Sequence, residues 1–127
     1  MTTPGGVVLD AGAFLALERR QGTMVHLARR FIEARTPLAT SAGVIAQIWR
    51  GGARDQAPVS ILLRQTEVVD LTYPVAKILG RILGFTRTTD PIDAHVVLIA
   101  RERAWPVLTS DVSDLLAIDP DLVVERI

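Results

Sequence analysis

The chain contains no cysteine, which excludes disulfide bonds and zinc sites built from thiolates. It also has no apolar run long enough to cross a bilayer, and its first residues lack the basic segment and apolar core of a secretory signal. We therefore expect a cytoplasmic protein that is not associated with a membrane.

An excess of charge of one sign is also missing. The 14 basic and 14 acidic residues cancel, which excludes the strongly basic surface of a nonspecific nucleic-acid coat protein. An enzyme that visits RNA remains compatible with this balance. Aromatic residues make up only 5% of the chain, and no string of them accompanies Trp49 or Trp105. We expect these two side chains in the core or at an interface rather than in a base-stacking platform.

Apolar residues, by contrast, are abundant. They make up 49% of the 127 residues, a length that suits one domain with a proper core, and we expect a single domain over 1–127. The mean hydropathy of +0.31 is high for a monomer that covers its whole surface with polar groups. Some apolar surface is therefore expected to meet another chain.

Short apolar runs alternate with helical patterns along the sequence. This alternation predicts an α/β fold, a three-layer α/β/α sandwich with a mostly parallel central sheet. Strands are expected at 7–9, 37–40, 67–70, 106–109 and 122–125. Helices are expected at 11–20, from 24 after a Thr23 cap, and at 42–50, 59–65, 75–83, 92–103 and 112–116.

Several residues are predicted to bound these helices. Ser41 is suited to an N-cap, and Asp90 followed by Pro91 is typical of a cap with proline at the first helical position. Glycines are expected to stop two other helices, one at Gly51-Gly52 and one near Gly84.

Acidic residues follow the strand ends. Asp10 ends the first strand and Asp111 follows the fourth, while Asp93 lies at the start of a helix. Taken one at a time, every acid except Asp10 is explained as a cap or turn residue. Ligands of open parallel sheets bind beyond the carboxyl ends of the strands, so the fold can bring these acids together. Such a cluster, with no basic neighbour in sequence, would suit Mg²⁺ or Mn²⁺.

Four blocks of sequence add a resemblance to a known family. They read VLDAGAFLALER at 8–19, VIAQIWRGG at 44–52, DAHVV at 93–97 and VLTSDVSDL at 107–115. In this order, and over nearly the whole chain, they resemble the PIN-domain family, and within it the VapC-type toxins of bacterial toxin–antitoxin pairs. The resemblance implies a Mg²⁺- or Mn²⁺-dependent endoribonuclease that acts on RNA, forms a homodimer and is inhibited by a cognate antitoxin.

The resemblance also implies roles for individual positions. It assigns the metal ligands, which are also the catalytic acids, to Asp10, Asp93 and Asp111. It makes Asp114 an accessory acid, and Thr109 or Ser110 a residue that holds a ligand or phosphate.

One position departs from the family pattern. Gln47 stands where the family has a glutamate, and an amide is a weaker ligand for a hard cation and cannot act as a base. The sequence leaves open a natural loss of activity, a variant that works with the remaining acids, and a deliberate substitution. Arg50, about one turn further on, either faces the site or is a solvated helix-end arginine. His95 points away from Asp93 and is expected to be a packed or capping residue.

Three hypotheses for function follow. The first is the ribonuclease, and the second is a PIN-like module that binds an antitoxin or RNA without cutting. The third, a receiver-like phosphoacceptor, is disfavoured because the only lysine, Lys77, lies within a helix. For a protein partner, Phe14, Leu15 and Leu17 together with the apolar stripe from Met24 to Phe31 predict a groove that accepts an amphipathic helix.

Overall fold

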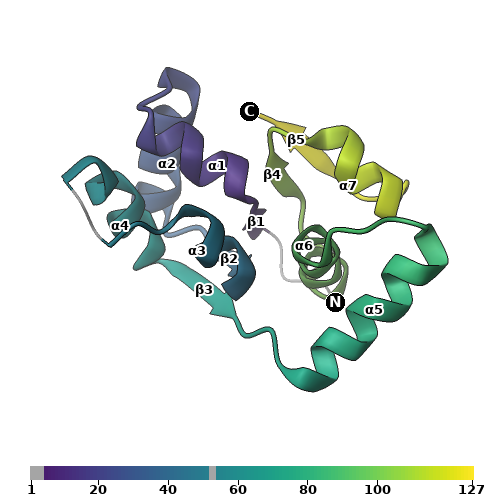
Figure 1. The fold of residues 1–127 in the computed structure, drawn as a ribbon. Helices are drawn as coiled ribbons and strands as arrows, with labels where there is room; N and C mark the ends of the chain where they lie inside the picture. The colour runs from purple at the N-terminus through teal and green to yellow at the C-terminus, as the bar shows by residue number, and fades with distance from the viewer. Residues whose placement is uncertain (1–4, 52–53) are drawn as a thin grey trace.

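One sheet organises the molecule (Figure 1). The computed structural model describes residues 5–51 and 54–127, and its strands pair only in parallel, in the order β3-β2-β1-β4-β5. The strands are β1 (Val7–Leu9), β2 (Leu38–Ser41), β3 (Thr66–Val69), β4 (Val107–Thr109) and β5 (Val124–Arg126).

In the described part of the chain, seven α-helices cover the two faces of the sheet. Helices α1 to α4 pack together on one side and α5 to α7 on the other, which confirms the predicted three-layer α/β fold (Figure 1). The helices are α1 (Ala11–Glu18), α2 (Gly22–Ala34), α3 (Ala42–Ile48), α4 (Ala57–Leu63), α5 (Tyr73–Thr86), α6 (Pro91–Arg103) and α7 (Val112–Ile118), with a 3-10 turn, η1 (Arg54–Gln56), before α4. No helix among the described residues is long and apolar enough to cross a membrane.

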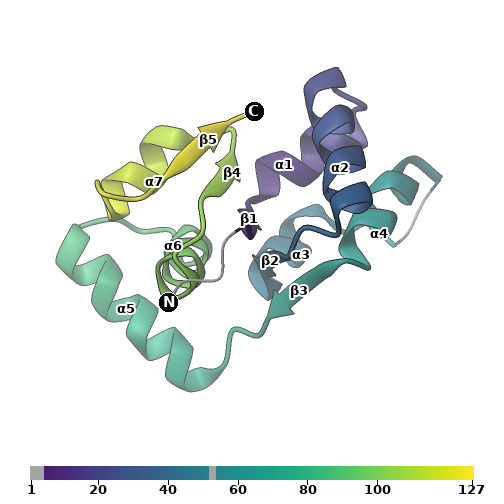
Figure 2. The same ribbon diagram turned by 180° about the vertical axis from the view of Figure 1, so that it is seen from behind.

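The strand order places a topological switch at β1. From β1 the chain moves outward through β2 to β3 and then returns to the other side of β1, where β4 and β5 complete the sheet. Figure 2 shows β3 and β5 at opposite edges, with β1 between them. Parallel α/β sheets bind ligands at such a switch, beyond the carboxyl ends of the two strands that flank it. In this protein that point lies between the ends of β1 and β4.

The core is centred on these two strands and on α6. Val8, Leu9, Val107 and Leu108 are almost completely buried, as expected for parallel strands covered on both faces. Helix α6 is apolar on most of its circumference, with six buried residues between Ala94 and Ala100, and it contacts β1, β2 and β4. It is therefore a central helix rather than a surface one, and its first turn is held firmly above the switch point.

Two of the predicted caps are confirmed. The Ser41 hydroxyl accepts a hydrogen bond from the Gly43 amide at 3.0 Å. The Asp90 carboxylate accepts from the amides of Ile92 at 2.9 Å and Asp93 at 3.1 Å. Each satisfies amides that the first helical turn leaves without partners, so α3 and α6 begin where the sequence indicates.

Other helix ends differ from prediction. Helix α2 is capped by the Gln21 side chain, which accepts from the Met24 amide at 3.1 Å, so the expected Thr23 cap is wrong. Gly84 lies inside α5, which continues to a left-handed residue at Arg87. Helix α3 ends at Ile48, before the glycines predicted to stop it, and Gly52 is outside the described residues. Three helices end in left-handed residues that are not glycine, so a search for glycine misplaces their ends.

Candidate functional site

Asp10 lies at the end of β1, with its side chain almost fully buried. One carboxylate oxygen accepts from the Ala11 amide at 2.8 Å and the other from the Thr109 hydroxyl at 2.9 Å. Burial raises the pKa of the Asp10 carboxyl, the two hydrogen bonds lower it in part, and the charges of Asp111 and Asp90 raise it further. The Thr109 bond joins the ends of β1 and β4 directly across the switch point.

Asp93 is held in the first turn of α6, half-buried near the same point. Burial is the main cause that raises its pKa to about 7, and the charges of Asp90, Asp10, Asp114 and Asp111 add to it. Four other carboxylates thus lie close enough to act on Asp93. The structure brings together acids from β1, α6 and the β4–α7 segment, as the sequence predicts for their positions in the fold.

Asp111 is held by a hydrogen bond from its backbone amide, and its side chain does not cap α7. Its amide donates to the Thr109 hydroxyl at 2.8 Å, and its exposed side chain makes no capping bond to α7 although it occupies the N-cap position. The alternative reading of Asp111 as a helix cap therefore does not account for its carboxylate. Thr109 serves as a bridge, because its hydroxyl donates to Asp10 and accepts from the amide of Asp111.

Glycine is required where the β4–α7 turn approaches α1. A Cβ atom on Gly12 would overlap the side chain of Ser110 and come within 3.0 Å of the Ser110 backbone nitrogen. Ser110 itself is exposed. The close approach fixes the turn that carries Asp111 against the start of α1, and it is Ser110 that makes this contact.

A cleft of about 390 Å³ opens beside Asp93. The turn before α6 and the outer face of α7 line it, and Asp10 and Asp111 lie outside its lining. Its lining residues are Thr88, Thr89, Asp90, Asp93, Asp114, Ala117 and Ile118. Asp114 therefore faces the same space as Asp93, as an accessory acid would. The role of Asp90 is broader than capping, because its charge also raises the pKa of Asp93.

Gln47 lies on the exposed side of α3, and Arg50 is exposed just beyond the end of that helix. The guanidinium group of Arg50 donates to the backbone carbonyls of Trp49 at 2.8 Å and Gln47 at 3.1 Å. It thus satisfies carbonyls at the end of α3, where a cation also interacts favourably with the helix dipole. Of the two readings of Arg50, this is the helix-end arginine.

The structure also contains a hydrogen-bonded pair of buried polar residues that the sequence does not predict. The Ser41 hydroxyl and Nδ1 of His95 are 2.6 Å apart, and both side chains are almost fully buried. Burial lowers the pKa of His95, so its imidazole is neutral near pH 7. His95 is a packed residue, as expected, but its partner is 54 positions away, and no local pattern in the sequence links the two.

The donor set fits a hard divalent cation in its chemistry. Carboxylate oxygens are the ligands that Mg²⁺ and Mn²⁺ prefer. The two ion pairs found among residues 5–51 and 54–127 lie elsewhere, between Arg101 and Asp119 and between Arg103 and Glu67. Within the same ranges, however, no three acidic or histidine side chains are arranged to hold a metal ion. The carboxylates would have to move closer together to share one cation.

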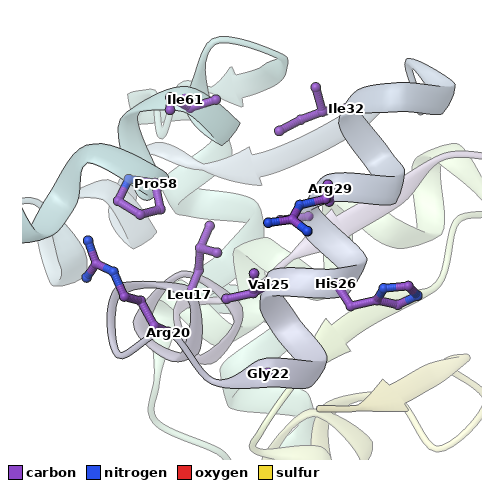
Figure 3. Close-up of a pocket in the computed structure, with 10 residues that line it drawn as sticks. Leu17, Arg20, Gly22, Val25, His26, Arg29, Ile32, Pro58 and Ile61 are labelled. Atoms are coloured by element: carbon purple, nitrogen blue, oxygen red, sulfur yellow. The ribbon is translucent and has the colours of Figure 1, made fainter.

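A separate apolar groove of about 600 Å³ lies between α2 and α4. Figure 3 shows Leu17 and Val25 at its floor, Pro58 and Ile61 on the α4 side, and the Arg29 side chain lying over it. The predicted groove is correct only in part. Phe14 and Met24 are fully buried in the core, and the second wall comes from α4, which the sequence reading did not include.

A family model described as PIN domain matches residues 7–118. No curated protein matches the chain. Among solved structures, the chain is similar to VapBC2 from Rickettsia felis bound to a DNA fragment from their promoter. That match has a TM-score of 0.67 and 14% identity, and it covers 96% of this chain and 98% of that one.

Two further structures have the same fold. PAE2754 from Pyrobaculum aerophilum matches with a TM-score of 0.68 and 18% identity, over 97% of this chain and 85% of that one. FitAcB from Neisseria gonorrhoeae matches with a TM-score of 0.62 and 17% identity, over 93% of this chain and 95% of that one.

Proposed function

The chain belongs to the PIN domain family, whose members are generally nucleases, and from that premise we propose that it is a metal-dependent endoribonuclease toxin. One observation carries the proposal. Acids from three separate segments lie near the ends of β1 and β4, where burial, together with the charges of the neighbouring acids, raises the pKa of Asp10 and of Asp93. Like charges at the switch point disfavour the ionised forms of Asp10 and Asp93, and carboxyls perturbed in this way are typical of functional sites.

Asp10, Asp93 and Asp111 would hold Mg²⁺ or Mn²⁺, with Asp114 as an accessory acid. A bound cation of this kind stabilises the charge that develops on a scissile phosphate. The protein would contribute by holding these carboxylates in place. Thr109 holds Asp10 through its hydroxyl and orients the turn of Asp111 through the amide of that residue, while the Asp90 cap fixes the first turn of α6 under Asp93.

RNA cleavage in the presence of Mn²⁺ tests the proposal. We expect Asp93→Asn to abolish cleavage and Asp121→Asn to leave it unchanged, because Asp121 is an exposed acid that precedes β5, near the amino end of β4 and away from the carboxyl ends of the strands. We expect Gln47→Glu to raise cleavage, since it restores the charge that the family carries at this position. If neither the chain nor its Gln47→Glu variant cleaves RNA, the enzymatic proposal is wrong.

Gln47 favours a second candidate, a PIN-like module that binds without cutting. An amide in place of the family's carboxylate would weaken a cation site to which position 47 contributes, and the acids of the described residues are not arranged around one ion. Calorimetry with Mn²⁺ separates the candidates. Binding that Asp10→Asn removes supports the nuclease, whereas no heat of binding in either the chain or its Gln47→Glu variant supports the module.

The groove between α2 and α4 supports an antitoxin as partner. Its apolar floor suits the apolar face of an amphipathic helix, and Arg20 and Arg29 at its rim suit acidic residues on that helix (Figure 3). We propose that the antitoxin docks there. Ile61→Asp is then expected to prevent co-purification with the product of a neighbouring short reading frame, because it buries a charge in the interface.

A homodimer, a single domain over 1–127 and a cytoplasmic location complete the proposal. Exposed apolar residues on α5 support the dimer: Tyr73 is 77% exposed and Phe85 is 91% exposed, although both are large. A second copy would remove such side chains from water.

A further inference from the structure

The contact between Ser41 and His95 joins the end of β2, the strand that pairs with β1, to α6, the helix that carries Asp93. Ser41 ends β2 and caps α3, the helix that carries position 47. His95 lies in α6 one residue beyond Ala94, and Asp93 lies on the same first turns of that helix. The 2.6 Å contact between Ser41 Oγ and His95 Nδ1 is buried and forms a polar link between these two helix starts.

Tight packing supports this link. Next to the hydrogen bond, the start of α3 approaches the start of α6 so closely that a Cβ atom on Gly43 would come within 2.8 Å of Ile92 Cγ1. Ile92 directly precedes Asp93. A shift of α6 relative to α3 would therefore move the Asp93 carboxylate, because α6 is a rigid helix at this point.

We propose that Ser41 and His95 are a positioning pair that sets the first turn of α6, and with it Asp93, relative to the end of β2 and the start of α3. Neither side chain touches a reacting group. The inference rests on the proposed function, because the consequence of the pair is the arrangement of carboxylates that a cation would use.

A hydrogen-bonding pair and a pure packing contact differ in one respect that can be measured. Asn places an oxygen and a nitrogen near the position of the histidine Nδ1, so it can keep the bond to Ser41 but fills less space. Leu fills the space better and has no polar atom. If the hydrogen bond positions α6, His95→Asn should keep the Mn²⁺ affinity better than His95→Leu. If only packing matters, His95→Leu should keep it better, because the cavity that asparagine leaves destabilises the core.

The experiment compares His95→Leu and His95→Asn in the full chain carrying Gln47→Glu, with Mn²⁺ affinity from calorimetry as the readout. We expect His95→Leu to weaken Mn²⁺ binding by about tenfold, the lower end of the effect of residues that orient metal ligands. We expect His95→Asn to bind Mn²⁺ nearly as tightly as the parent, although it is the less stable of the two in thermal unfolding. Ser41→Ala should weaken binding as His95→Leu does.

If instead the Mn²⁺ affinity falls in step with thermal stability, so that His95→Asn binds Mn²⁺ more weakly than His95→Leu, the positioning pair is overturned. A second readout separates this failure from that of the proposed function. If the parent binds no Mn²⁺, the proposed metal site is wrong, and the pair is judged by the backbone amide resonance of Asp93. That resonance should move in His95→Leu and stay in place in His95→Asn, and equal shifts in both variants overturn the inference.

Discussion

Asp93 is the residue whose environment has the clearest consequence for solution behaviour. Its pKa is raised to about 7, so in the absence of cations the folded protein holds a proton there that the unfolded chain releases near its ordinary value of 3.8. The stability contributed by Asp93 is therefore full below about pH 4 and is lost as the pH rises through about 7. Divalent cations should reverse this trend, because they favour the ionised carboxylate.

A pair of proteins isolates this effect. His95, whose pKa is lowered by burial, destabilises the fold as the pH falls below about 6.5 and would mask Asp93 in a simple pH scan. We therefore compare the free energy of unfolding of the chain with that of Asp93→Asn. In a chelating buffer, Asp93→Asn should gain stability relative to the parent as the pH rises from about 4 to about 8. A difference that does not change with pH would contradict the raised pKa.

Gly12 is the second residue with a sharp prediction. Gly12→Ala places a Cβ atom against Ser110, so the Ser110 side chain must rotate and the turn beside it must give way slightly, and we expect a loss of about 1 kcal/mol in the free energy of unfolding. Ser110→Gly should restore part of that loss in the double variant, which denaturant unfolding would measure. Gly22→Ala is the matched control, since nothing lies within 4 Å of the added atom. Equal effects at the two glycines would rule out the overlap as the cause.

Individual elements show which features a sequence reveals. Helix starts at Ser41 and Asp90 were predictable because the caps are local and use short polar side chains. Helix ends at Arg35, Arg87 and Ala104 were not, because each of these residues adopts a left-handed conformation that its side chain disfavours. Tertiary packing holds the ends in place, and packing is not visible in a local pattern.

The end of α6 provides a test of the free energy that a left-handed residue other than glycine costs. Ala104 has a φ of 56°, and glycine adopts this conformation without the steric penalty of a Cβ atom. We expect Ala104→Gly to raise the free energy of unfolding by about 0.5–1 kcal/mol. Ala76→Gly, at an exposed position within α5, should lower it by a similar amount. Destabilisation by both changes would mean that the left-handed end is not strained.

At the scale of the whole molecule, the parallel sheet and the placement of Asp10 and Asp111 at neighbouring strand ends were predictable, because an α/β alternation dictates where strand ends lie. The groove was only half predictable. Met24 is buried in the core while Val25 lines the groove, and the second wall of the groove comes from α4, whose docking against α2 no local pattern reveals. The contact between Ser41 and His95 likewise depends on the packing of α3 against α6.

Self-association is the prediction that belongs to this scale. Phe85 is 91% exposed on α5, beside the partly buried Ile82, and a second copy would cover it. We expect Phe85→Glu to convert a dimer into a monomer, because a charge replaces an apolar contact. Light scattering after size-exclusion chromatography measures the mass, with Ala76→Glu, at an exposed position on the opposite face of the same helix, as the control. A mass unchanged by Phe85→Glu would place the dimer contact elsewhere.

The exposure of Gln47 has a consequence for how such a protein changes over generations. Its side chain projects from α3 into solvent, and Arg50 donates to its backbone carbonyl rather than to its side-chain amide. The codons for glutamine and glutamate differ only in their first base. An exchange between the two at this position would leave the core and the groove intact, so a lineage can lose or regain the charge in a single mutational step without passing through an unfolded intermediate.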